Sequence, residues 1–313
     1  MSFLYFLEGL RTPVLDFIFS LITLCGEETV FMAIGMIVFW CFNKYQGYYL
    51  LCVGFLGTLI NQFLKMLFRI PRPWVKDPDF TIVESAREAA SGYSFPSGHT
   101  QTSVGLFGGL ARENKNIVLR IIAIALCVLV PLSRMYLGVH TPADVCVSVC
   151  IALVLIFVAS PLFKKAATSP KVMYSIIFTF LGIMIAYLCF ICFYQFPESV
   201  YAEENVHNLI SARKNGFTLT GCVLGLLLVY TADIKWIKFE TSAVWWAQII
   251  KVIGGLALVV AAKELLRFPL DAILPKDTFA RMVRYFLMVI IGGILWPMTF
   301  KYFSSLGKKS EKK

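Results

Sequence analysis

Charged residues are scarce in this chain. Asp, Glu, Lys and Arg make up 15% of its 313 residues, whereas about a quarter of the residues in a soluble domain are charged. The mean hydropathy is high, at +0.74. The sequence also lacks internal repeats, low-complexity segments and any loop long enough to hold a soluble domain. These absences exclude an ordinary soluble globular protein and a repeat protein.

Metal-binding patterns are lacking as well. The chain has nine cysteines and three histidines, but it has no two CxxC pairs of the kind that hold zinc. Cys189 and Cys192 come nearest, and they lie inside the apolar segment LCFICF. Cysteines in such segments pack as small hydrophobic side chains. We therefore expect no metal and no cofactor, and we infer no redox compartment from the cysteines.

Long apolar blocks make up much of the sequence. Examples are residues 117–132 and 145–163, and blocks of roughly 17–25 residues match the thickness of a bilayer core at the rise of an α-helix. The sequence therefore predicts an all-α fold, a polytopic transmembrane helical bundle of about nine spans. The predicted spans are 27–43, 47–68, 97–112, 116–133, 142–163, 171–195, 213–231, 245–265 and 281–303.

The N-terminal residues 1–25 differ from these blocks. They carry Glu8, Arg11 and Asp16 among aromatic and aliphatic residues, and they lack the basic start and small-residue cleavage site of a secretory signal. We predict an interfacial amphipathic helix here, with a tilted or re-entrant span as the alternative.

The loops fall into two sets by charge. The lysine-rich set comprises 44–46, 113–116, 164–170, 232–244 and the C-terminal tail; the other, which mixes bases with acids, comprises 69–96, 134–141, 196–212 and 266–280. Loops rich in Lys and Arg stay in the cytoplasm. We therefore expect a cytoplasmic C-terminus and an outward-facing second set. The net charge of +10 is then a matter of membrane orientation, and no nucleic-acid partner is predicted.

Three polar clusters lie at helix ends of the second set. They are Lys65, Arg69 and Arg72 with Pro73; Pro96 to His99; and Ser133, Arg134, His140 and Asp144. Each cluster alone has a structural explanation. The cations could anchor the helix at lipid headgroups, Ser97 could cap a helix, and Thr141, Pro142 and Asp144 suit a helix start with a capping box. Because the span count places all three clusters on one membrane face, they can also converge.

A phosphate group would explain the three clusters together. Arginines grip its oxygens bidentately and a lysine adds charge. The backbone N–H groups of Ser97 and Gly98, at a helix start, would add donors. One histidine could attack phosphorus while the other protonates the leaving oxygen. A carboxylate four residues after His140 could hold the attacking imidazole in the correct tautomer.

In this order, K-x6-RP, PSGH and SR-x5-H-x3-D resemble the signature of the type 2 phosphatidic acid phosphatase (PAP2) superfamily, and every signature position is filled between residues 65 and 144. The resemblance implies that His140 is the nucleophile, that Asp144 orients it and that His99 is the general acid. It also implies a phosphate site without metal, made of Lys65, Arg72, Ser97, Gly98 and Arg134. Arg69 lies outside the signature, and His207 matches no motif.

The resemblance also divides the chain. We expect an interfacial helix at 1–25, a catalytic membrane core at 26–195, additional transmembrane helices at 196–304 and a basic cytoplasmic tail at 305–313. The implied substrates are lipid phosphates or diphosphates of the undecaprenyl pyrophosphate, phosphatidate or phosphatidylglycerol phosphate class, in a bacterial plasma membrane. A soluble sugar phosphate, as for glucose-6-phosphatase, or sphingosine 1-phosphate is the enzymatic alternative. A membrane protein that binds or translocates phospholipids is the non-enzymatic one. The extra helices could also form a homodimer interface.

Overall fold

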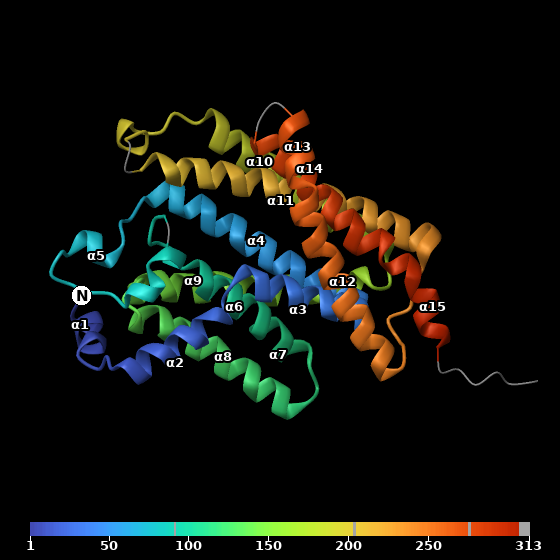
Figure 1. Ribbon diagram of the computed structural model, residues 1–313, viewed down its shortest axis with the longest axis horizontal. Helices are drawn as coiled ribbons and strands as arrows, with labels where there is room; N and C mark the ends of the chain where they lie inside the picture. The colour runs from blue at the N-terminus through green and yellow to red at the C-terminus, as the bar shows by residue number, and fades with distance from the viewer. Residues whose placement is uncertain (91, 203–204, 275–276, 307–313) are drawn as a thin grey trace, which may run out of the picture. The chain divides into compact units, whose positions relative to one another are not determined.

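The computed structural model describes residues 1–90, 92–202, 205–274 and 277–306. Every regular element in this part of the chain is a helix, as Figure 1 shows. The predicted all-α fold is therefore confirmed. Nearly all of the predicted basic tail, including its four lysines at 308, 309, 312 and 313, lies outside the described residues.

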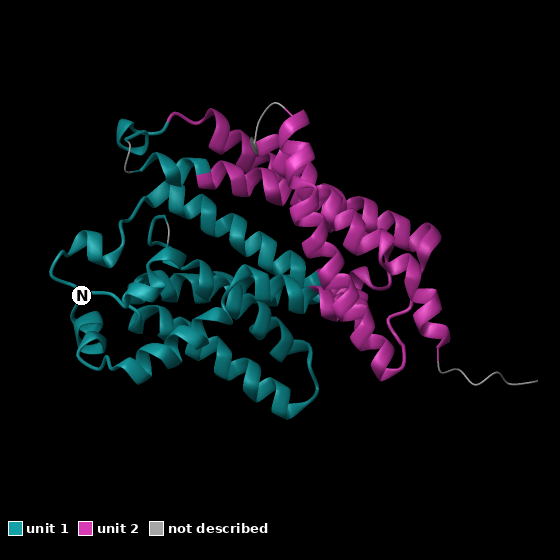
Figure 2. Cartoon of the chain, in the orientation of Figure 1, with its two compact units in different colours: residues 1–35, 49–162, 196–210 teal, residues 36–48, 163–195, 211–313 magenta. Residues whose placement is uncertain are grey.

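The helices form two compact units, which Figure 2 distinguishes by colour. The first unit comprises residues 1–35, 49–162 and 196–210, and the second comprises 36–48, 163–195 and 211–313. Each unit is described by itself below.

The first unit carries all of the predicted site residues. Its helices are α1 (Ser2–Glu8), α2 (Pro13–Leu24), the first half of α3 (Glu28–Cys41), most of α4 (Lys44–Phe68), α5 (Pro73–Lys76), α6 (Gly98–Ser103), the π-helical η3 (Val104–Gly108), α7 (Gly109–Glu113), α8 (Ile117–Tyr136) and most of α9 (Pro142–Ala166). Three short 3-10 helices also belong to it: η1 (Glu84–Ala86), η2 (Glu88–Ala90) and η4 (Glu198–Val200).

The helix starts of the first unit follow from local sequence. Thr12 caps α2 by accepting a hydrogen bond from the N–H of Leu15, with Pro13 in the first turn. Asn116 caps α8 by accepting from two backbone N–H groups. These side chains satisfy donors that a helix start otherwise leaves unpaired.

The N-terminal segment is tied to the first unit by polar contacts. Arg11 donates from Nε to the carbonyl oxygen of Tyr136 and from Nη1 to that of Thr81, and Tyr136 donates its hydroxyl to Asp16. The predicted single helix at 1–25 is instead two helices, α1 and α2. Pro13, which favours a helix start, begins the second.

The second unit consists of α10 (Pro170–Phe193), most of α11 (Val206–Ala232), the π-helical η5 (Asp233–Ile237), α12 (Trp245–Leu265), α13 (Arg267–Ile273), α14 (Asp277–Ile290), the π-helical η6 (Ile291–Leu295), η7 (Pro297–Thr299) and α15 (Phe300–Ser305), with the end of α3 and the start of α4. Two of its lysines have polar partners. Lys44 forms a 2.8 Å ion pair with Asp233, and Lys251 donates to the carbonyl oxygen of Thr241 at 2.9 Å. Such pairing lowers the cost of charge inside an apolar bundle.

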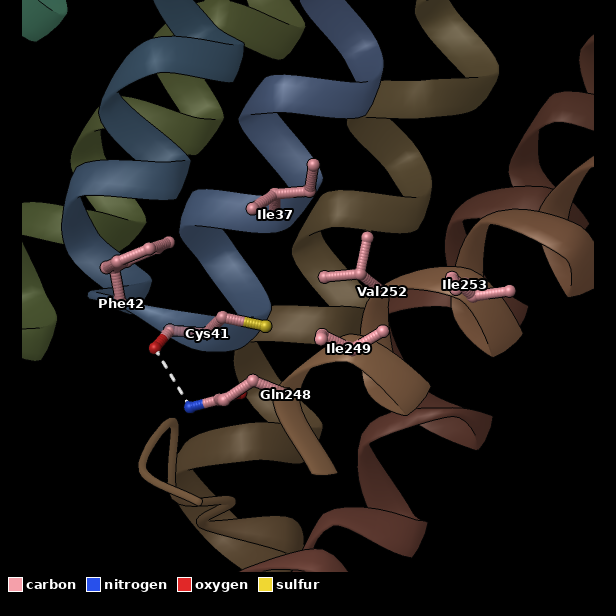
Figure 3. A pocket seen from close by; sticks show the side chains of 7 residues that line it. All are labelled: Ile37, Cys41, Phe42, Gln248, Ile249, Val252 and Ile253. Carbon is pink, nitrogen blue, oxygen red and sulfur yellow. Dashed lines mark hydrogen bonds between the residues drawn. The ribbon is translucent and has the colours of Figure 1, made fainter. Parts of the chain in front are cut away.

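An apolar cavity of about 290 Å³ lies in the second unit, at the end of α3 and along α12 (Figure 3). Gln248 supplies an amide that donates to the carbonyl oxygen of Cys41. The lining residues are Ile37, Cys41, Phe42, Gln248, Ile249, Val252 and Ile253. None of the predicted site residues is among them, so this cavity is not the candidate catalytic site.

Six helical segments of the described residues are long and apolar enough to cross a membrane: Lys44–Lys76, Ile117–Tyr136, Pro142–Ala166, Pro170–Phe193, Val206–Ile237 and Thr278–Ser305. A seventh arises if α2 and α3, which meet at a 45° bend, form one broken span. That bent pair fits the tilted or re-entrant alternative for the N-terminal segment.

The predicted number of nine spans is not confirmed. The predicted span 27–43 corresponds to α3, which has 14 residues and reaches spanning length only together with α2. The predicted span 97–112 is the short run from α6 to α7, with a π-helical turn inside it. The predicted span 245–265 is α12, which carries Lys251, Lys263 and Glu264 and is not among the six.

Candidate active site

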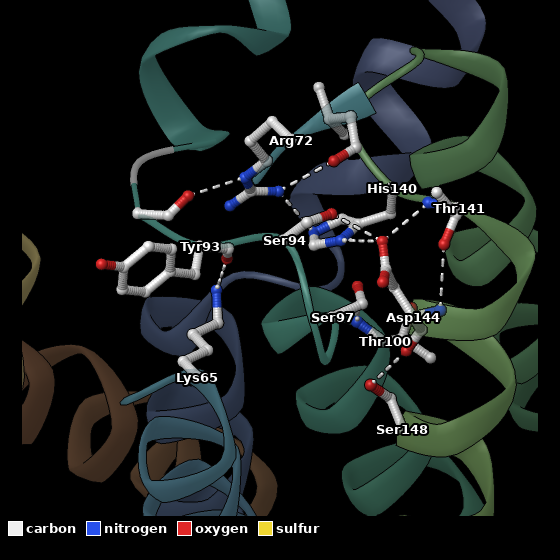
Figure 4. Close-up of polar contacts among 12 residues, drawn as sticks. Lys65, Arg72, Tyr93, Ser94, Ser97, Thr100, His140, Thr141, Asp144 and Ser148 are labelled. Carbon is white, nitrogen blue, oxygen red and sulfur yellow. Dashed lines mark hydrogen bonds and ion pairs between the residues drawn. The ribbon is translucent and has the colours of Figure 1, made fainter. Parts of the chain in front are cut away.

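The three predicted clusters meet at one place in the first unit, which Figure 4 shows from close by. Lys65 comes from the last turn of α4 and Arg72 directly precedes α5. His99 lies in the first turn of α6, Arg134 in the last turn of α8, and His140 just before α9. Helix ends from distant parts of the sequence thus supply the polar groups.

His140 lies between a guanidinium and a carboxylate. Its Nε2 is 2.9 Å from Nη1 of Arg72, and its Nδ1 is 3.4 Å from Oδ2 of Asp144. Because a guanidinium can only donate, Nε2 must be the acceptor and the ring proton must sit on Nδ1, facing Asp144. This tautomer leaves the lone pair on Nε2, which is the form that a nucleophilic imidazole needs.

The environment keeps His140 neutral. The side chain is 2% exposed and lies in the loop between α8 and α9, outside both spans. Burial, and then the positive charges of Arg72 and its neighbours, lower the pKa of His140 well below its ordinary value.

Asp144 joins two of the clusters. Its Oδ2 accepts hydrogen bonds from Oγ of Ser94 at 2.6 Å and from the N–H of Thr141 at 2.8 Å. The N–H of Asp144 donates in turn to Oγ1 of Thr141, so the predicted capping box at the start of α9 is present. One carboxylate therefore starts the helix, receives Ser94 and faces His140.

Two of the three basic residues of the first cluster, Lys65 and Arg72, bind the loop before α6. Lys65 donates from Nζ to the carbonyl oxygen of Tyr93 at 2.7 Å. Arg72, which is 5% exposed, donates from Nε to the carbonyl oxygen of Gly92 and from Nη1 to that of Val139. Both side chains thus hold the loop and bring positive charge to His140.

Arg69 is placed differently. Its backbone has φ +52°, at the residue that follows α4. Its Nη1 donates to the carbonyl oxygen of Met66 in the preceding turn. This local bond makes Arg69 a helix-end residue, consistent with its position outside the signature.

The PSGH segment starts α6. Ser97 accepts a hydrogen bond from the N–H of Thr100 through its hydroxyl, as an N-cap does. The N–H of Ser97, however, donates to the carbonyl oxygen of Asp144 at 3.2 Å. In the structure this expected phosphate donor is thus paired within the chain, where it joins α6 to α9.

Gly98 has open space beside it at this helix start, and His99 has a ring nitrogen without a hydrogen-bond partner among the described residues. A Cβ atom built on Gly98 would meet no other atom within 4 Å, so the space in front of the helix start is open. Nε2 of His99 is buried and has no hydrogen-bond partner among the described residues. A buried imidazole nitrogen without a partner is unfavourable unless a ligand supplies one.

The third cluster adds a buried guanidinium. Arg134 is 1% exposed and donates from Nη1 to Oγ1 of Thr23 at 2.8 Å, while its Nε has no partner among the described residues. Ser133 points back into α8 and donates to the carbonyl oxygen of Val130. Ser133 therefore has a structural contact rather than a place at the imidazoles.

Sequence reasoning missed two hydroxyl residues of this site. Ser94 lies two positions before the start of the PSGH motif and within hydrogen-bond distance of Asp144. Thr23 comes from α2, far upstream of the signature. Neither belongs to a motif, and only the folded structure shows what their hydroxyl groups contact.

The positive charge that the described residues bring to this place belongs to Lys65, Arg72 and Arg134. Three such charges beside two imidazoles are the groups that a phosphate anion would need as partners. One imidazole is oriented as a nucleophile and the other has an unused nitrogen. The arrangement can therefore transfer a phosphoryl group through histidine.

Comparison with known proteins also indicates a phosphatase. Residues 45–168 match the PAP2 superfamily, and residues 217–309 match the transmembrane extension of PAP2 superfamily phosphatases. No solved structure matches the chain.

Three curated relatives are similar to the chain. Undecaprenyl-diphosphatase BcrC of Bacillus subtilis is 29% identical over 151 residues, which cover 47% of this chain and 74% of that protein. Phosphatidylglycerophosphatase B of the same organism is 28% identical over 172 residues, 50% of this chain and 79% of the relative. A probable sphingosine-1-phosphate phosphatase of Dictyostelium discoideum is 29% identical over 160 residues, which cover 47% of this chain but 38% of that protein. The chain belongs to the PAP2 superfamily, and it is an integral membrane phosphatase.

Proposed function

We propose that this phosphatase hydrolyses a lipid phosphate or diphosphate, without a metal, through a phosphohistidine intermediate on His140. The observation that carries the proposal is the position of His140, with Nε2 toward the guanidinium of Arg72 and Nδ1 toward Asp144. A phosphate whose oxygens take over the Arg72 donor would leave the Nε2 lone pair facing phosphorus.

In the first step, Nε2 of His140 forms a bond to phosphorus, and the bond from phosphorus to the leaving oxygen breaks. His99 donates its proton to that oxygen, which departs as an alcohol or, from a diphosphate, as a phosphate monoester. The imidazolium formed on His140 keeps its Nδ1 proton and is stabilised by Asp144.

In the second step, water attacks the phosphorus of phosphohistidine. His99 now accepts a proton from this water, the bond between Nε2 and phosphorus breaks, and inorganic phosphate leaves. The charge on the phosphoryl oxygens is stabilised throughout by Lys65, Arg72 and Arg134. The negative charge of the bound phosphate also favours the protonated form of His99, whose pKa is lowered by burial and then by the surrounding cations.

A lipid substrate is supported by the place of the site. The polar groups lie at the ends of spanning helices, where a headgroup can meet them while its tail stays in the bilayer. The names of the three relatives contain a lipid diphosphate and two lipid monophosphates. We therefore propose a substrate of the undecaprenyl diphosphate, phosphatidate or phosphatidylglycerol phosphate class, ahead of a soluble sugar phosphate.

The test is a substrate panel. Purified protein in detergent is given undecaprenyl diphosphate, phosphatidate, phosphatidylglycerol phosphate, sphingosine 1-phosphate and glucose 6-phosphate, each with EDTA, and phosphate release is measured. The proposal expects turnover of at least one of the first three lipids and inhibition by vanadate. Turnover of glucose 6-phosphate alone, or a strict need for a divalent metal, would contradict it.

We further propose that the site faces outward from a bacterial plasma membrane and that the C-terminus is cytoplasmic, because the lysine-rich loops are those expected to stay inside. Glu88→Cys is exposed on the predicted outer side, and Lys115→Cys on the predicted inner side. A membrane-impermeant thiol reagent should label the first variant and spare the second in intact cells. The reverse pattern would overturn the orientation.

A further inference from the structure

The junction between α2 and α3 lies directly against the candidate site. Thr23, in the last turn of α2, accepts a 2.8 Å hydrogen bond from Nη1 of Arg134. Both side chains are buried, at 7% and 1% exposure. Residues 1–41 precede the matched PAP2 region at 45–168, so no signature motif assigns a role to this junction.

The contact fixes the orientation of the Arg134 guanidinium. The group is planar, and its five N–H bonds point in fixed directions relative to one another. Once Nη1 is held by Thr23, the direction of the Nε–H is determined as well. Nε has no partner among the described residues, so it remains available to an acceptor on a ligand.

Gly26 brings the same junction against His99. A Cβ atom at this position would lie 3.0 Å from both the Cβ and the carbonyl oxygen of His99, and 2.9 Å from Cγ1 of Val130. The two separations from His99 are tighter than nearly all contacts of a real Cβ atom, and the one from Val130 is shorter still, so the close approach favours glycine. The junction thus contacts His99, which is assigned to leaving-group protonation, as well as Arg134, one of the three cations proposed to bind phosphate.

We infer that the α2–α3 junction forms one wall of the phosphate site, in which Thr23 is a positioning residue for Arg134. Thr23 acts on the substrate only through the guanidinium that it holds. The inference rests on the proposed function and deepens it, because it extends the phosphate site beyond the family signature.

A graded series of substitutions tests this role. Thr23→Ser keeps the hydroxyl acceptor, Thr23→Cys replaces it with a weak sulfur acceptor, and Thr23→Val keeps the side-chain volume without an acceptor. Ser20→Ala is the matched control, because Ser20 lies one turn earlier on α2 and its hydroxyl contacts Ser85 instead.

Two readouts are needed. The first is the dissociation constant of inorganic phosphate, measured from the rise of the thermal midpoint with phosphate concentration, which requires no turnover. The second is the division between KM and kcat for a lipid phosphate. A merely structural role would lower the thermal midpoint without phosphate and leave both readouts unchanged in the protein that remains folded.

The expected result is weaker phosphate binding by about 10-fold in Thr23→Val, because a hydrogen bond to a charged group is lost. KM should rise in proportion, Thr23→Cys should be intermediate, and Thr23→Ser and Ser20→Ala should match the wild type. If Thr23→Val does not fold, the comparison of Thr23→Ser with Thr23→Cys still decides.

Equal phosphate affinity across the series would overturn the inference while leaving the proposed function intact. Absence of lipid phosphate turnover in the wild type would instead overturn the proposed function, and the phosphate-binding series would still report on Thr23.

Discussion

The hydroxyl oxygen of Ser94 lies 2.6 Å from Oδ2 of Asp144, closer than the 3.4 Å that separates the same oxygen from Nδ1 of His140. Ser94 thus holds the carboxylate of Asp144, which is proposed to orient His140. The contact joins the loop before α6 to the start of α9. Ser94, which lies outside the signature, therefore helps to position the proposed nucleophile, His140.

Replacing Ser94 with alanine should lower kcat by about 10-fold. The carboxylate of Asp144 then loses the short hydrogen bond that holds it in one rotamer. KM should change little, since the hydrogen bond of the Ser94 hydroxyl among the described residues is to Asp144 and not to Lys65, Arg72 or Arg134. The matched control is Ser148→Ala, a buried serine whose hydroxyl contacts the backbone oxygen of Asp144 rather than its carboxylate. If both variants lose kcat equally, the carboxylate contact is not the cause.

Gly98→Ala should weaken substrate binding without destabilising the protein. An added Cβ meets no protein atom within 4 Å, so the thermal midpoint should stay at the wild-type value. The methyl group would instead occupy the space proposed for a phosphoryl oxygen, and KM should rise by about 10-fold or more. Gly182→Ala, where the added atom also meets nothing within 4 Å, is the control. A wild-type KM in Gly98→Ala would show that the phosphate does not bind at the start of α6.

Arg72→Lys should lose most activity although the charge is kept. The guanidinium contacts three acceptors at once, on Gly92, Val139 and His140, and a single ammonium group cannot reproduce this geometry. We expect kcat/KM to fall by about 100-fold or more. Arg69→Lys, whose side chain contacts its own helix end, should retain near wild-type kcat/KM. Equal losses in the two variants would contradict the assignment.

Stability should decrease toward acid pH because of His140. Its pKa is lower in the folded protein than in the unfolded chain, so the unfolded chain binds the extra proton first as the pH falls below about 6.5. The stabilising contribution is therefore present above that pH and lost as the pH falls toward the folded pKa. The thermal midpoint of His140→Asn should fall less than that of the wild type between about pH 8 and pH 5.5. Parallel curves would show that His140 is not buried in its neutral form.

The sequence predicted the convergence of the three motifs, because each motif lies at the end of an apolar segment and segment counting places such ends on one face. The capping box of Thr141 and Asp144 was also predictable, since it depends on residues three positions apart. The contacts of Ser94 and Thr23 were not, because a hydroxyl group in a long chain gives no sign of its distant partner. The N–H of Ser97 was assigned to phosphate from its helix-start position, yet the backbone of Asp144 accepts its bond.

The span count was the least predictable feature. Hydropathy alone does not separate a spanning helix from a short buried one such as the run from α6 to α7, whose apolar part, residues 104–111, packs inside the first unit. Gly26, Glu27 and Glu28 interrupt the apolar run between the predicted helix at 1–25 and the predicted span at 27–43. The break between α1 and α2, by contrast, was not predicted.

His140 is expected to carry the phosphoryl group during turnover, and this phosphohistidine can be trapped. A lipid phosphate labelled with ³²P is mixed with the enzyme, quenched in alkali within milliseconds and digested for peptide mapping. We expect an alkali-stable, acid-labile label on the peptide that contains His140, which is lost in His140→Ala and still formed in Ser148→Ala. Full turnover by His140→Ala, or a label on any other residue, would contradict it.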